Sequence, residues 1–166
     1  MTVLYDGGWF AHEVDSKGLE FLTEPKDGVT ILCYSSSKGL FLLLHERMSA
    51  TGNASPVVCS LTGSIDPGEA PRQTALRELA EEAGAVILDE DLHQLGDYVH
   101  TYKGCTKKTY MFFAELSGAA FIRATGDGST VEEQAYVKWH PLQDVLLSAD
   151  ALLLASLARA QNAKLV

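Results

Sequence analysis

The stretch GSIDPGEAPRQTALRELAEEAGA, residues 63–85, decides the fold of this chain, because it predicts a tight loop that leads directly into one helix. Asp66 and Pro67 are a turn signal within the loop. Pro71 suits the first helical position, where its missing N–H has no helical partner. Gly84 suits the position directly after the last helical residue. We therefore predict a helix between Pro71 and Gly84.

The two sides of this predicted helix differ in chemistry. Apolar residues recur at i, i+3, i+4 and i+7 on one side, and these are Leu76, Leu79, Ala80 and Ala83. Glu78, Glu81 and Glu82 recur on the opposite side. Like charges at this spacing repel, whereas Mg²⁺ binds carboxylate oxygens together with water and phosphate. The acidic side is therefore either a solvated surface, softened by Arg77, or a cation site.

A fixed spacing of residues favours the cation site. The pattern is Gly63, five residues, Glu69, seven residues, Arg77-Glu78-Leu79, one residue, Glu81-Glu82, one residue and Gly84. This pattern resembles the signature of the Nudix hydrolases at every fixed position. The sequence departs from it at Ala85, where that family usually carries Ile, Leu or Val.

The resemblance implies a fold and a reaction. The fold would be a Nudix-type α-β-α sandwich with a central mixed sheet, in the α/β (α+β) class, with a small N-terminal antiparallel sheet in addition. The reaction would be metal-dependent hydrolysis of the diphosphate linkage in a nucleoside diphosphate joined to another moiety. Mg²⁺ would be the cofactor, with Mn²⁺ as the alternative ion.

The resemblance also implies roles for individual residues. The metal ligands would be Glu78, Glu81, Glu82 and the backbone carbonyl of Thr62, with Glu78 and Glu82 also assigned to catalysis. Glu69 and Arg77 would form a structural ion pair that holds the loop against the helix, since a loop that presents a carbonyl to a metal needs support. The motif glycines Gly63, Gly68 and Gly84 would let the backbone approach the metal and the diphosphate closely.

Other candidate site residues lie outside the motif. Glu133 stands six residues before Trp139, where many Nudix enzymes carry a glutamate that binds metal or acts as the general base. Glu132 is the second choice, and a helix carboxylate the third. Arg47 follows a predicted strand and could contact phosphate through its bidentate fork. Tyr102 stands seventeen residues after Ala85, where the dinucleoside polyphosphate hydrolases carry a base-stacking tyrosine.

The substrate is predicted with two alternatives. We prefer the ADP-ribose and nucleoside-diphosphate-sugar pyrophosphatases. This chain resembles them in its N-terminal strands, in Arg47 and in the sequence of its motif loop. Those enzymes usually carry a proline about sixteen residues after the motif, and this chain does not. Tyr102 instead favours a dinucleoside polyphosphate or a capped RNA end. A non-catalytic nucleotide sensor of the same fold is disfavoured, because the motif keeps all its carboxylates.

Composition limits the number of domains, the kind of partner and the location that can be expected for this chain. With 166 residues, 46% of them apolar, the chain is expected to form a single domain over residues 1–166. A net charge of −9 argues against an extended nucleic-acid surface. The sequence shows no signal peptide and no apolar run long enough to cross a bilayer, so a cytoplasmic location is expected. Residues 1–25 would form the N-terminal strands, which in related enzymes pack across a homodimer.

Alternating and continuous apolar runs predict the remaining strands. The expected strands are residues 2–5, 8–14, 19–23, 28–34, 39–45, 57–61, 92–102, 108–116 and 135–139. Helices are expected over residues 142–147 and 149–160. The nearly continuous apolar character of 28–34 and 39–45 predicts strands that are buried on both faces.

Overall fold

The structure is a computed structural model that describes residues 1–8, 10–47, 56–100, 104–126 and 135–166. Its strands are β1 (Thr2–Asp6), β2 (Ala11–Val14), β3 (Glu20–Thr23), β4 (Gly28–Ser35), β5 (Leu40–Glu46), β6 (Val57–Cys59), β7 (Leu61–Ser64), β8 (Ala85–Val86), β9 (Leu92–Gln94), β10 (Thr109–Glu115), β11 (Ala120–Phe121) and β12 (Tyr136–His140). Its helices are α1 (Pro71–Ala83), the 3₁₀ helix η2 (Asp89–Asp91), α2 (Leu142–Leu146) and α3 (Ala151–Asn162). None of the described helices is long and apolar enough to cross a membrane.

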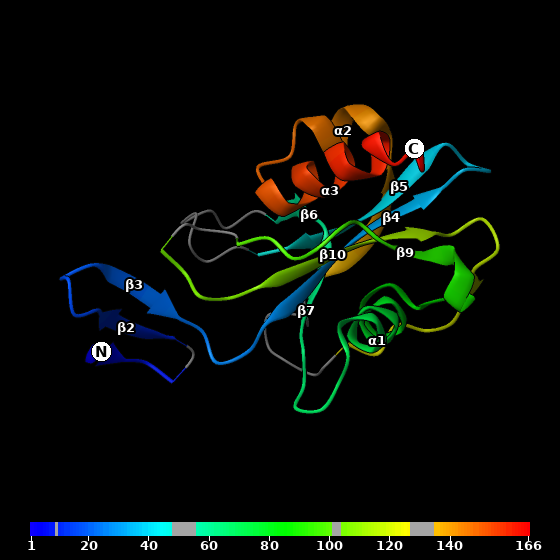
Figure 1. The fold of residues 1–166 in the computed structure, drawn as a ribbon. Coiled ribbons are helices and arrows are strands. Elements are labelled where there is room, and N and C mark those ends of the chain that lie inside the picture. The colour runs from blue at the N-terminus through cyan, green and yellow to red at the C-terminus, as the bar shows by residue number, and fades with distance from the viewer. Residues whose placement is uncertain (9, 48–55, 101–103, 127–134) are drawn as a thin grey trace.

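The central sheet lies between α1 on one face and α2 with α3 on the other (Figure 1). Its strand order is β12-β5-β4-β10-β9, with β6 added to β5 and β7 added to β4. β4 and β10 run parallel, while the other pairs in this sheet are antiparallel. The predicted α-β-α sandwich with a mixed central sheet is therefore confirmed.

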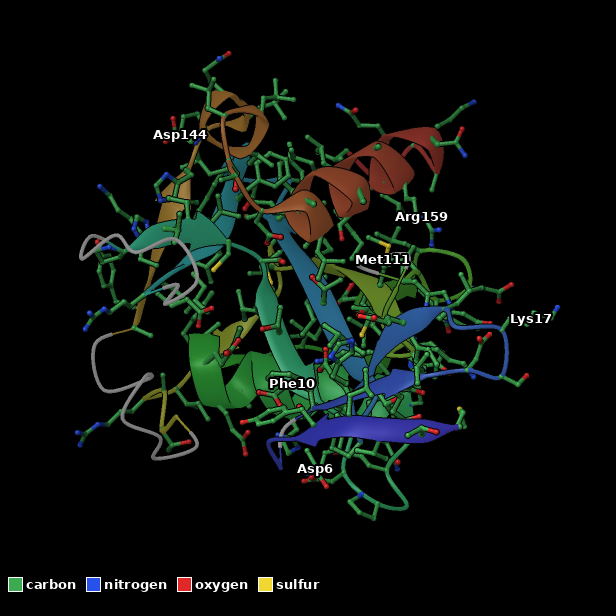
Figure 2. All side chains as sticks on the ribbon, turned by 90° about the vertical axis from the view of Figure 1, so that its left-hand side faces the viewer. Asp6, Phe10, Lys17, Met111, Asp144 and Arg159 are labelled. Atoms are coloured by element: carbon green, nitrogen blue, oxygen red, sulfur yellow. The ribbon has the colours of Figure 1, made fainter. Side chains whose placement is uncertain are left out.

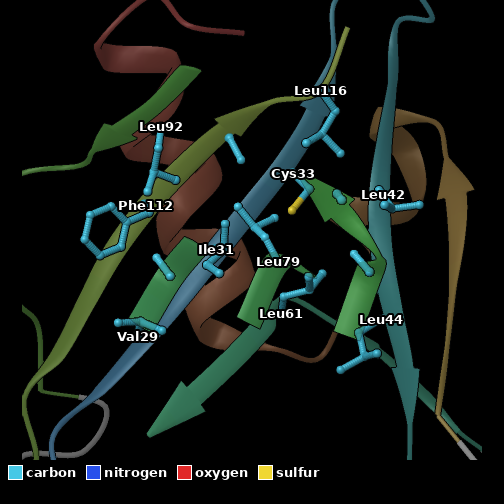
Figure 3. Packing of buried hydrophobic residues seen from close by; sticks show 14 of the residues in the cluster. Val29, Ile31, Cys33, Leu42, Leu44, Leu61, Leu79, Leu92, Phe112 and Leu116 are labelled. Carbon is cyan, nitrogen blue, oxygen red and sulfur yellow. The ribbon is translucent and has the colours of Figure 1, made fainter. Parts of the chain in front are cut away.

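Successive residues of the central strands enter two different cores, because side chains alternate across a sheet. Val29, Ile31 and Cys33 of β4 pack with Leu79 of α1, as Figure 3 shows. Leu32 lies in the opposite core, which it shares with residues of α2 and α3. The same alternation holds along β5 and β10. Both faces of these strands are therefore buried, as their apolar runs predict.

The strands β4 and β5 diverge, and the chain before the motif fills the space between them. β4 pairs with β5 through its second half and with β7 through its first half, while β5 pairs with β6 beyond that point. Ser60 is the residue at which the chain changes partner from β5 to β4. Its N–H and its hydroxyl donate to Asp150 Oδ2 at 2.9 and 2.8 Å, and Thr30 Oγ1 donates to Ser60 Oγ at 2.7 Å. This buried network fixes the strand that leads into the motif loop.

The edge strand β12 is joined to β5 and α2 by a chain of side chains. His45 Nε2 and His140 Nε2 lie 2.8 Å apart, and His140 Nδ1 lies 2.7 Å from Asp144 Oδ2. Tyr136 stacks on the His45 ring at a centroid distance of 4.5 Å. Only one of the two Nε2 atoms can carry a proton in their shared hydrogen bond, so this connection depends on protonation.

The first three strands form a separate antiparallel sheet, as predicted. Figure 1 shows it to one side of the central sheet, and in Figure 2, where that side faces the viewer, Asp6 and Lys17 mark two of its turns. Backbone bonds join it to the body, since Leu22 N–H donates to Gly104 O and Thr106 N–H to Leu22 O. Every residue of β1 is exposed.

Three predicted strands differ from the structure. The strand expected over 8–14 begins at Ala11, because Gly8 takes a left-handed backbone with φ of +82° and the Gly7 N–H donates to Phe10 O in a turn. The strand expected over 57–61 is two short strands, because the buried Ser60 turns away from β5 to pair with Asp150. The strand expected over 92–102 ends at Gln94, since Gly96 takes a left-handed backbone with φ of +78°. Among the described residues of this stretch, Val99 forms an antiparallel bridge with Thr109.

Candidate functional site

The helix α1 has the boundaries that its sequence predicts. Pro71 occupies its first turn, and the backbone N–H of Ala70 donates to the Gln73 side chain at 2.9 Å. Gly84 ends it in a left-handed conformation with φ of +62°, and its N–H donates to Leu79 O. Leu79 and Ala83 of the predicted apolar stripe are buried, whereas Leu76 and Ala80 are half-buried. Ala75 and Glu78 are buried as well, so the buried side of α1 extends into the acidic side.

Arg77 joins the acidic side of α1 to the motif loop through hydrogen bonds. Nε donates to Glu69 Oε1 at 3.1 Å, while Nη2 donates to Glu69 Oε2 at 3.1 Å and to the carbonyl oxygen of Ser64 at 3.2 Å. Nη1 donates to Glu78 Oε1 at 2.7 Å and to Glu81 Oε2 at 2.8 Å. A guanidinium has five N–H donors, so the five contacts use all of them. The motif loop and two of the three helix glutamates thus converge on one side chain.

Glu69 joins the motif loop to the helix. Besides Arg77, it accepts a hydrogen bond from Thr74 Oγ1 at 2.8 Å and one from the backbone N–H of Asp66 at 3.3 Å. The Arg77 hydrogen bonds lower the pKa of Glu69 to about 2, against a smaller opposing effect of burial. Glu69 is therefore a charged anchor at any pH at which the protein is expected to work.

Glu78 and Glu82 lie against the strand that leads into the motif loop. Glu78 is 7% exposed, and its carboxylate fills the space beside Gly63 that a side chain there would need. Glu82 Oε2 accepts a hydrogen bond from the backbone N–H of Thr62 at 3.3 Å. The residues predicted as metal ligands are thus brought together at the junction of β7 and α1.

Each of the three motif positions favours glycine for a different reason. At Gly63 the Glu78 carboxylate leaves no room for a Cβ. At Gly68 the reason is the backbone, since φ is +85° and the space around a Cβ is open. At Gly84 both reasons apply, because φ is +62° and a Cβ would overlap Ile122 O and lie 3.1 Å from Ala124 N.

The donor set fits a hard divalent cation. Carboxylate and carbonyl oxygens are what Mg²⁺ and Mn²⁺ prefer, and Glu78, Glu81, Glu82 and Thr62 provide such oxygens within two adjacent elements. In the described part of the chain, however, no three His, Cys, Asp or Glu side chains are already arranged to hold a metal ion. Two of these carboxylates are instead oriented by Arg77.

The predicted residues outside the motif are only partly described. Arg47 follows β5 directly and is exposed. Tyr102, Glu132 and Glu133 lie outside the described residues. Glu46, the last residue of β5, is not among the predicted site residues, and its pKa is raised by burial and then by the nearby charge of Asp150. Strand alternation could have identified it, because it places Glu46 on the same side of the sheet as Leu42 and Leu44, which face α1.

A hollow of about 360 Å³ lies on the Glu69 side of the motif loop. The segment after β3 forms one wall, with Pro25 and Asp27, and Tyr110 lies in another. Lys26 Nζ forms an ion pair with Asp66 Oδ1 at 2.7 Å. The link from the N-terminal sheet thus contacts the motif loop directly.

Comparison with known proteins agrees with this geometry. A family model described as "NUDIX domain" matches residues 24–160. No curated protein matches the chain. A solved structure titled "Crystal structure of ADP compounds hydrolase" superposes with a TM-score of 0.69 at 20% sequence identity, covering 97% of this chain and 89% of that one. At this identity the likeness shows the fold, including the N-terminal sheet that the family model does not reach.

Proposed function

This chain belongs to the Nudix family of pyrophosphohydrolases, and we propose that it cleaves the diphosphate linkage of ADP-ribose or of a nucleotide sugar. The observation that carries the proposal is that Glu78 and Glu82 both contact the strand that bears Thr62, while Arg77 joins Glu78 to Glu81. The solved ADP compounds hydrolase, which shares the fold over 97% of this chain, supports an ADP-linked substrate.

The family generally uses a divalent metal, and we propose Mg²⁺, with Mn²⁺ as the alternative. Glu78, Glu81, Glu82 and the Thr62 carbonyl would hold it. When bound, such an ion neutralises phosphate oxygens and lowers the pKa of a coordinated water. Gly63 contributes by leaving space for the Glu78 carboxylate beside the backbone. The ion pair of Glu69 with Arg77 keeps the loop in register with the helix.

A carboxylate must accept the proton of the attacking water. We propose Glu133 for this role, with Glu132 or a helix carboxylate as alternatives. A general base acts when it comes within hydrogen-bond reach of the proton that it accepts. Arg47, exposed at the end of β5, is proposed to contact a substrate phosphate.

We propose that residues 1–166 act as one domain and that two copies form a homodimer through the N-terminal sheet. β1 is an edge strand with Val3, Leu4 and Tyr5 all more than half exposed. An exposed apolar edge strand favours pairing with another chain. Sedimentation equilibrium of the full chain and of a Leu4→Lys variant tests this, and a monomeric parent contradicts it.

The substrate is tested with a panel of ADP-ribose, UDP-glucose, GDP-mannose, diadenosine tetraphosphate and 8-oxo-dGTP, each with Mg²⁺. The measured quantity is kcat/KM, and Glu82→Gln is the negative control. We expect the highest value for ADP-ribose or a nucleotide sugar. The highest value for diadenosine tetraphosphate supports instead the polyphosphate alternative, for which Tyr102 was singled out. No hydrolysis of any compound, with binding retained, supports a sensor.

A further inference from the structure

We propose that the Arg77 guanidinium occupies the place of the divalent cation between Glu78 and Glu81, so that the cation enters by exchange with Arg77. The inference rests on the metal site of the proposed function and concerns how that site is loaded. It follows from the division of the Arg77 contacts into two groups.

The first group holds the motif loop. Nε and Nη2 make three contacts of 3.1 to 3.2 Å to Glu69 and to the Ser64 carbonyl oxygen. None of these acceptors is a proposed metal ligand. This group can remain when a cation binds.

The second group holds two proposed ligands. Nη1 lies 2.7 Å from Glu78 Oε1 and 2.8 Å from Glu81 Oε2. These are the shortest Arg77 contacts, in the range of charge-assisted hydrogen bonds. Glu78 is 7% exposed, and a buried carboxylate needs a compensating positive charge. Nη1 supplies that charge where a divalent cation would.

The same oxygens cannot serve both cations equally well. A lone pair that accepts an N–H is less available to a metal, and a divalent ion between Glu78 and Glu81 repels the adjacent guanidinium. Binding therefore releases the two Nη1 contacts while the Glu69 contacts persist. Arg77 thus lowers the metal affinity of the site while it stabilises the metal-free protein.

The exchange is tested on the wild-type chain labelled with ¹⁵N-arginine. Mg²⁺ binding is measured by calorimetry, and the Nε–H and Nη–H signals are followed in the same titration. We expect the Arg77 Nη1 signals to lose protection from solvent exchange as Mg²⁺ saturates, while the Nε–H signal persists. Arg72, which contacts Asp89 from another part of the same helix, is the internal control and should not change. Unaltered Nη1 signals at calorimetric saturation overturn the inference, whereas absence of Mg²⁺ binding overturns the proposed metal site itself.

A variant provides a second readout. Arg77→Lys keeps the charge but cannot span both groups of acceptors. We expect a lower Tm without Mg²⁺ and a larger rise in Tm on adding it, with a Kd for Mg²⁺ lower by about tenfold. Arg72→Lys is the matched control and should keep the wild-type Kd. If Arg77 only supports the loop, Arg77→Lys instead binds Mg²⁺ more weakly than wild type, and that result contradicts the exchange.

Discussion

The carboxylate of Glu78 lies in the space that a side chain at position 63 would fill. The two residues are fifteen positions apart, in β7 and α1, and this contact fixes how closely the strand approaches the helix. Gly63 is therefore required for space and not for its backbone, because its φ is not positive.

Gly63→Ala should displace Glu78 and weaken Mg²⁺ binding, since a methyl group overlaps the carboxylate. Overpacking of this kind costs about 1–3 kcal/mol of unfolding free energy, and we expect kcat to fall in addition. Gly68→Ala is the matched control, because it has open space and strains only its left-handed backbone. Calorimetric Mg²⁺ titration of both variants checks this, and equal losses of affinity in the two would contradict it.

Glu82→Gln should retain the fold and lose about 10²–10³-fold in kcat, the usual effect of removing one preorganised electrostatic group. The amide can still accept the Thr62 N–H bond that the carboxylate accepts, so the Tm should change little. Steady-state hydrolysis of the preferred substrate measures the loss. Glu90→Gln, an exposed glutamate of η2, should be as active as the parent. A Glu82→Gln enzyme with parental turnover would show that the metal site is wrongly assigned.

The contribution of Glu69 to the unfolding free energy should be lost in acid. The Arg77 hydrogen bonds lower its pKa from 4.5 to about 2, so the unfolded chain binds a proton at a pH where the folded chain does not. The stabilisation is therefore complete above pH 4.5 and is lost as the pH falls toward 2. Urea unfolding across this range should show a smaller pH dependence for Glu69→Gln than for the parent. Identical slopes in the two proteins are the contradictory outcome.

The His45–His140 contact should weaken below pH 6.5. Burial, then the charges of His140 and Lys138, lower the pKa of His45 from 6.5, so the unfolded chain gains protons first as the pH falls. The contribution of the neutral His45 to the unfolding free energy should then be complete above pH 6.5 and decrease below it. Asp144 and Tyr136 also face this pair. His45→Gln, which keeps a donor toward His140, should flatten this part of the stability curve; a curve that keeps its parental shape argues against the assignment.

Asp150→Ala should reduce the unfolding free energy by about 2–4 kcal/mol, because it leaves two backbone N–H groups without their acceptor. Those groups are the N–H of Ser60 and the N–H of Leu152 at the start of α3. Asp97→Ala, at an exposed position, is the control and should be neutral. Denaturant titration gives both values. A loss below about 1 kcal/mol would mean that water replaces the carboxylate.

The sequence predicted the features that depend on neighbouring residues. Pro71 and Gly84 gave the ends of α1, and the apolar runs gave β4 and β5 to within one residue. Features that depend on distant residues were not predicted. Ser60 interrupts a strand because of Asp150, ninety positions later. The softening of the acidic side by Arg77 followed from spacing, and Arg77 does contact both Glu78 and Glu81. That one nitrogen, Nη1, makes both contacts depends on side-chain rotamers, which spacing alone does not specify.

The insertion of β6 and β7 between β4 and β5 has a consequence for the order of assembly. The strand that carries Thr62 is held by Ser60, which contacts Thr30 on one side and Asp150 on the other. Closing such long loops costs chain entropy before any contact is gained. The junction of β7 and α1 should therefore be among the last parts to acquire native structure during refolding, and recovery of the proposed hydrolysis should lag behind recovery of helix.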